Sequence, residues 1–227
     1  STTRAMTVAS GASLVLDNAN GNIDVPGNYT LSLNGSGNTA IGPVSGAIVN
    51  WSGNNSLSGA TTLAGNTTLA SLAGTLTLSG DIAGNYTLTV QGDGDTLLTG
   101  ARGGTSTLTK NGAGTLTLTG ASSFSGAVTL NAGVMNVRNN TALGTTAGGV
   151  TTYIGSELQL QNDVTIGAEA LSLRGTGLSN SGALRNISGT NTWGGAITLG
   201  MTDVRINSDA GKLVLDWGKF ERANRPA

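Results

Sequence analysis

The sequence predicts an all-β chain wound as a single parallel β-helix, or β-solenoid, of roughly ten rungs with little or no helix. Two observations carry this prediction: short strands of period two that end at glycine-rich corners, and a phrase that occurs three times. Short strands with such corners are typical of sandwiches, barrels and solenoids alike. Self-similarity along the chain is typical of stacked repeats, so it favours the solenoid.

The repeated phrase consists of one large apolar residue, a small residue, Gly-Ala and a short alternating strand. It occupies residues 56–63, 123–130 and 192–199. The large apolar position holds Leu57, Phe124 and Trp193. A position that accepts any large apolar side chain is typical of core packing, so we expect Trp193 in the core and not at a ligand.

Alternating segments follow one another along the chain, with Leu or Val on one face and mainly Thr, Ser or Gln on the other, which is the pattern of a half-buried strand. They lie at residues 13–16, 29–33, 75–78, 86–90, 115–119, 157–160, 170–173 and 212–215. The side chains expected to face inward are Leu76, Leu78, Leu88, Val90, Leu116, Leu118, Val128, Leu130, Leu171, Leu173, Ile197, Leu199, Leu213 and Leu215. Most segments end at Gly, Asn or Asp, residues that tolerate the backbone of a tight corner.

A longer repeat relates the two ends of the chain. Residues 29–80 align with 170–218, and residues 11–18 resemble 155–162. The chain therefore contains about one and a half copies of a module of roughly 140 residues. We expect one solenoid over residues 1–217, in which 8–80 and 152–217 are homologous, followed by a charged tail at 218–227.

Composition excludes several classes of function. The chain has 37 Gly, 10% charged residues and a formal net charge of −1, so nucleic acid and anionic membranes are not expected partners. Without His or Cys, thiolate metal sites and Ser/His/Asp or Cys/His catalysis are ruled out. The expectation is that the protein is not an enzyme and has no cofactor.

No stretch approaches the roughly 20 apolar residues of a membrane helix, and residues 1–12 do not have the pattern of a signal peptide. We expect no membrane insertion by this chain and, for an exported protein, a signal that has already been removed.

Few polar residues have a spacing that indicates chemistry. Asp93 and Asp95 lie in a Gly-rich corner with Arg102 downstream; the pair fits either a Ca²⁺ site or, more commonly, a simple turn. Trp51, Tyr153 and Trp217 fall outside the repeated phrase, and stacking of these rings on sugars stays open.

Residues 108–144 have a distinctive order: Leu-Thr-Lys, a Gly-rich corner, Thr-Leu-Thr-Leu, a phrase with Phe124, Asn-Ala-Gly, a third strand and Ala-Leu-Gly. This segment, within 81–151, closely resembles the autotransporter-associated β-strand repeat, also called the passenger-associated transport repeat. The resemblance implies a right-handed parallel β-helix in a bacterial passenger at the cell surface or secreted. Autotransporters also carry a C-terminal outer-membrane barrel, which this sequence does not include, so we expect a released or truncated passenger or an independently secreted protein.

The two ends of a solenoid expose unpaired strand edges, with which a strand of another chain can pair. The expected function is therefore structural: an extracellular subunit of a fibre or stalk whose copies stack head to tail, although true caps outside this sequence would explain the open tips equally well. The alternatives are an adhesin that binds glycans or a host or neighbouring cell surface, and, with less support from the sparse carboxylates, a β-helix enzyme that degrades polysaccharides.

Overall fold

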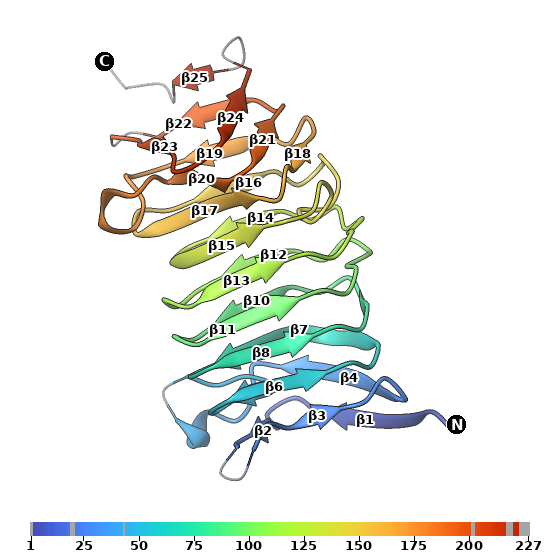
Figure 1. Ribbon diagram of the computed structural model, residues 1–227. Coiled ribbons are helices and arrows are strands. Elements are labelled where there is room, and N and C mark those ends of the chain that lie inside the picture. Colours follow the sequence, from blue (N-terminus) through green and yellow to red (C-terminus); the bar gives the residue numbers. More distant parts are fainter. Residues whose placement is uncertain (1, 19–20, 43, 201–202, 217–219, 223–227) are drawn as a thin grey trace.

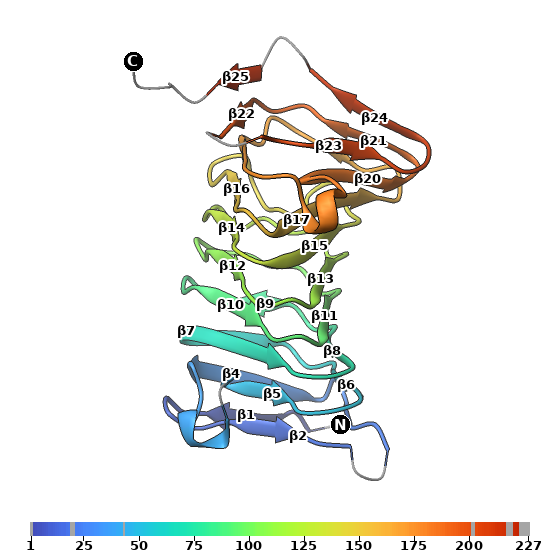
Figure 2. The ribbon, with the colours of Figure 1, turned by 90° about the vertical axis from the view of Figure 1, so that its left-hand side faces the viewer.

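The computed structural model describes residues 2–18, 21–42, 44–200, 203–216 and 220–222 (Figure 1). The chain is all-β and winds into a solenoid of about nine turns, which confirms the predicted fold class. Its N- and C-terminal ends lie at opposite ends of a rod (Figures 1 and 2). At about 4.8 Å per turn, the rod is on the order of 45 Å long. Two short 3-10 helices lie in corners, η1 (Thr39–Ile41) and η2 (Leu178–Asn180).

The strands stack on three faces, and each turn of the chain visits face one, face two and face three in that order. β7 (Thr61–Ser71) bends across a corner: its first residues pair with a strand of face one and its last residues with a strand of face two. Besides the start of β7, face one contains β1 (Arg4–Val8), β4 (Tyr29–Gly35), β9 (Ile82–Ala83), β18 (Thr165–Ile166), β21 (Thr190–Trp193) and β24 (Lys212–Leu215).

Faces two and three are the more regular ones, and every pairing given for their strands is parallel. Face two contains the end of β7 with β2 (Leu14–Leu16), β5 (Ile48–Asn50), β10 (Leu88–Gln91), β12 (Leu108–Lys110), β14 (Val128–Leu130), β16 (Val150–Thr152), β19 (Leu171–Leu173), β22 (Ile197–Leu199) and β25 (Phe220–Arg222). Face three contains β3 (Asp24–Val25), β6 (Asn54–Leu57), β8 (Thr75–Leu78), β11 (Asp95–Leu98), β13 (Thr115–Leu118), β15 (Gly133–Val137), β17 (Ser156–Gln161), β20 (Leu184–Ser188) and β23 (Ile206–Ser208).

The backbone of β25 pairs in parallel with β22. This strand falls within the segment expected to be a tail, most of which lies outside the described residues.

The inward side chains form one continuous core. Eleven of the fourteen residues expected to face inward are at most 3% exposed. The other three, Leu199, Leu213 and Leu215, are partly buried and lie in the last turns. Burying a Leu or Val side chain contributes about 1.5–3 kcal/mol, so the core residues of each turn contribute most of its stability, and they do so through contacts with adjacent turns.

The structure explains the phrase that occurs three times. Leu57, Phe124 and Trp193 are all fully buried, as expected. The glycine that follows packs on a carbonyl of the turn below: a Cβ at Gly59 would lie 1.6 Å from the Tyr29 oxygen, and one at Gly126 would lie 2.3 Å from that of Ser106. Only glycine fits such a corner, and the phrase therefore marks corners at which neighbouring turns approach closely.

Replacing Leu118 by Asp should destabilise the protein by several kcal/mol, because the carboxylate would be buried among apolar side chains without a partner. Thr117→Asp is the matched control, since Thr117 lies on the same strand and faces outward, and it should cost less than about 1 kcal/mol. Urea unfolding followed by circular dichroism measures both. Equal losses of unfolding free energy in the two variants would contradict the assignment of Leu118 to the core side of β13 and Thr117 to its outer side.

Candidate functional site

At the C-terminal end of the rod, strand edges and partly buried apolar side chains form a surface that the described residues leave uncovered. β23, β24 and β25 present strand edges on which the structure places no further strand among the described residues. Leu199, Val204, Ile206, Leu213 and Leu215 are only partly buried there. An open hollow of about 240 Å³ lies against this end and is lined by Ile206, Asn207, Ser208, Leu213 and Leu215.

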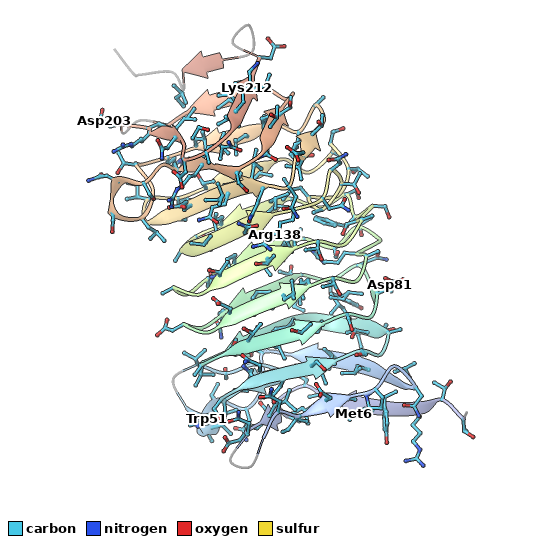
Figure 3. All side chains as sticks on the ribbon, viewed as in Figure 1. Met6, Trp51, Asp81, Arg138, Asp203 and Lys212 are labelled. Carbon is cyan, nitrogen blue, oxygen red and sulfur yellow. The ribbon has the colours of Figure 1, made fainter. Side chains whose placement is uncertain are left out.

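The N-terminal end is the counterpart of this surface. β1, β2 and β3 are the first strands of the three faces, and Leu14, Ile23 and Val25 are partly buried against the core. Figure 3 shows the two ends through their labelled side chains, with Met6 at the N-terminal end and Asp203 and Lys212 at the other. Unpaired edges beside incompletely buried apolar side chains are the features of a sheet that can accept another strand.

Buried asparagines connect turns near both ends. Asn50 is fully buried, and its Nδ2 donates to the Gly53 oxygen at 3.1 Å, to Ser71 Oγ at 3.1 Å and to the Ala73 oxygen at 2.9 Å. Asn55 Nδ2 donates to Asn50 Oδ1 at 2.6 Å. The side-chain amides thus satisfy carbonyls that a corner turns away from solvent.

The same cluster occurs a second time. Asn186 Nδ2 donates to the Gly189 oxygen, to Ser208 Oγ and to the Ala210 oxygen, and Asn191 Nδ2 donates to Asn186 Oδ1. Each residue has a counterpart of the same type in the first cluster, at the position that the internal repeat assigns to it. The first cluster joins faces two and three, whereas the second joins faces three and one, so the related segments are displaced by one face.

Lys110 occupies a corner between faces two and three in the middle of the rod. Its Nζ donates to the oxygens of Asn111 at 2.7 Å, Gly112 at 2.8 Å and Ala132 at 3.4 Å, and the side chain is 2% exposed. Burial lowers the pKa of Lys110 to about 8, although Asp95 and Asp93 favour the charged form. The ammonium group thus donates hydrogen bonds to the carbonyl oxygens of this corner, as the Asn50 amide does at another corner.

Arg102 is buried on face one and stacks on the Phe124 ring, with its guanidinium carbon 4.3 Å from the ring centre. Its Nη2 donates to Ser106 Oγ at 3.0 Å and to the Thr107 oxygen at 3.1 Å, while Nε and Nη1 have no hydrogen-bond partner. Burial lowers the pKa of Arg102 to about 10. The side chain is therefore held in the core by packing on an aromatic ring and by only one of its three nitrogens.

Asp93 and Asp95 do not form a site with Arg102, which the structure buries on another face. Asp95 Oδ1 instead accepts a hydrogen bond from the Thr115 nitrogen at 2.8 Å, so it binds the backbone of the next turn. Among the residues that the structure describes, no three His, Cys, Asp or Glu side chains lie together in a way that could hold a metal ion.

Face three carries a charged cluster that the spacing of charged residues in the sequence did not indicate. Glu157 is 1% exposed and accepts hydrogen bonds from Arg185 Nη1 at 2.9 Å, Gln159 Nε2 at 2.6 Å and Ser181 Oγ. Arg185 also binds Asp209, and the two carboxylates raise its pKa. Glu157, Arg185 and Asp209 come from three successive turns, so only the winding of the chain brings them together. Since each carboxylate is engaged by protein groups, the cluster ties turns together.

The aromatic residues considered for sugar contacts are separated in space. Trp51 is 41% exposed and lies near the corner at Gly42. Tyr153 is 39% exposed, and the Arg174 guanidinium stacks on its ring at 4.9 Å. Trp217 lies outside the described residues. Trp193 is fully buried, and its Nε1 donates to the Glu169 oxygen at 2.9 Å, which confirms its core position.

The described part of the chain has no helix of the length and hydrophobicity needed to cross a membrane.

Comparison with protein families gives a match for a segment in the middle of the rod. Residues 108–137, from β12 to β15, match the family described as Passenger-associated-transport-repeat. The chain carries a passenger-associated transport repeat. The match confirms the resemblance inferred from the order of strands and corners, and the repeat includes Lys110 and Phe124. Comparisons with curated proteins and with solved structures gave no significant match.

The lowered pKa of Lys110 predicts how stability depends on pH. A lysine in the unfolded chain has a pKa of about 10.4, so between pH 8 and pH 10.4 the unfolded chain binds more protons than the folded one. Stability should therefore rise with pH across this window, relative to Lys110→Met, which lacks the titrating group. Urea unfolding of both proteins at pH 7, 8, 9 and 10 measures the difference. The prediction would be contradicted if the free energy of unfolding of the wild type, relative to that of Lys110→Met, stayed constant or fell as the pH rises.

Proposed function

We propose that the chain is a structural subunit of an extracellular stalk or fibre at the bacterial cell surface, and that copies stack head to tail through the open ends of the solenoid. Three features support this. The passenger repeat belongs to proteins that are secreted to the surface. The continuous parallel ladder suits a stiff rod. The two ends combine strand edges with partly buried apolar residues.

The single observation that carries the proposal is the contrast between the ends and the middle of the rod. In the middle, inward Leu and Val side chains are at most a few per cent exposed because a turn lies on each side of them. At the ends, within the part of the chain that the structure describes, the outermost strands have a neighbouring turn on one side only, and Leu14, Leu213 and Leu215 are partly exposed. Stacking of a second copy removes this apolar surface from water and pairs the free edges, so both contributions favour an open head-to-tail assembly.

Electron microscopy and light scattering across a concentration series test the proposal. We expect isolated rods at low concentration and linear chains of rods at high concentration. Leu215→Asp, which places a carboxylate at the C-terminal end, should leave the circular dichroism spectrum unchanged and shorten the chains to single rods. Thr117→Asp, in the middle of an outer face, is the matched control and should still assemble. Single rods at every concentration of the unmodified chain would contradict stacking.

A further inference from the structure

The strands at the two ends have counterparts inside the rod, and the counterparts are covered. Leu213 and Leu215 of β24 correspond in the internal repeat to Leu76 and Leu78 of β8, and Leu14 of β2 corresponds to Leu158 of β17. The three internal residues are at most 1% exposed, whereas the three end residues are partly exposed. The difference lies in the neighbours and not in the side chains.

The internal counterparts also show what covers such strands. β8 is followed on its face by β11, in parallel and in register, and β17 is preceded by β15 in the same way. Each end strand therefore resembles an internal strand in sequence. The internal strand is paired with a further parallel strand on the side that is uncovered in the end strand. The fitting partner is a further turn of the same type, and the other end of a second copy provides one.

The helical path fixes how two copies fit. An end of a solenoid is not flat: it has a step of one turn at the place where the strand sequence starts or stops. At the C-terminal end the last described strand is β25 on face two. The next position along the path is on face three above β23, and no strand of the described residues occupies it. At the N-terminal end the first strand is β1. The one-turn steps at the two ends fit together without a gap only when β1 of one copy lies on β23 of the other.

We infer, on the basis of the stacking proposed above, that successive copies join with a rotation of one face, so that β1, β2 and β3 of one copy continue β23, β24 and β25 of the other. Without the rotation, β1 would lie on β24, its own face, and the step would leave a gap over β23. The rotation has a parallel within the chain, since the two asparagine clusters are likewise displaced by one face.

The internal repeat also gives the register of this junction. Leu76 and Leu158 stand in one inward column of face three, linked through the in-register neighbours Thr96, Leu116 and Met135. Their end counterparts therefore align as Leu14 over Leu213, and two residues on as Leu16 over Leu215. The outward residue between them, Val15, which is 40% exposed, then lies over Val214.

Cysteine cross-linking tests this junction without background, because the chain has no cysteine. Val15 and Val214 lie at opposite ends of one rod, so a disulfide between these positions must join two molecules. Single variants Val15→Cys and Val214→Cys are mixed under mild oxidation, and Thr7→Cys with Val214→Cys is the matched control for the unrotated junction. Adjacent outward positions on paired parallel strands have Cα atoms about 4.8 Å apart, within the range that a disulfide bridges, so the first mixture should give roughly ten-fold more covalent dimer than the control mixture.

The outcomes separate the two proposals. Preferential linkage of Val15→Cys to Val214→Cys supports the rotated junction. Preferential linkage of Thr7→Cys to Val214→Cys, or linear chains under the microscope with no linkage in either mixture, overturns the rotation while stacking stands. Single rods with no linkage overturn both. Reducing agent must return the dimer to monomer in each case, which shows that the link is the intended disulfide.

Discussion

The constraint on which this fold depends is that a polar backbone group in one turn finds its partner in the next. Along the strands the parallel ladder meets this demand, but corners turn carbonyls into a narrow core where water has no access. Different turns meet the demand with different residues: Asn50 and Asn186 through amides, Lys110 through an ammonium group. Where no side chain fits, as at Gly126, the corner packs directly on the carbonyl below. Stability is therefore local to neighbouring turns, as in other repeat proteins.

Much of the fold followed from the sequence because its signals are local. Alternation identified the inward residues, and the three that were expected to face inward but are only partly buried, Leu199, Leu213 and Leu215, lie in the last turns of the rod. The buried large residue of the repeated phrase could also be predicted, since Leu57, Phe124 and Trp193 share one position. The passenger repeat was recognisable from the order of its strands and corners.

What the sequence could not show depends on contacts between turns. Glu157, Arg185 and Asp209 are far apart in the chain and meet only because the rungs stack. Asp93, Asp95 and Arg102 are close in sequence, yet the corner between them sends Arg102 to another face, where it packs on Phe124. The displacement of the two related segments by one face is likewise invisible in an alignment, because it depends on how many strand positions of the three-faced path separate the two segments.

The central claim is that each turn is stabilised by the turns beside it, and that the end turns obtain the missing neighbour from another molecule. Hydrogen exchange measured at low and at high protein concentration tests it most directly, because protection reports local opening. The account predicts that amides of β2 and β24 exchange quickly in dilute protein and become protected, approaching those of β12, as concentration rises. Exchange of these end strands that is independent of concentration, while β12 stays protected, would contradict it.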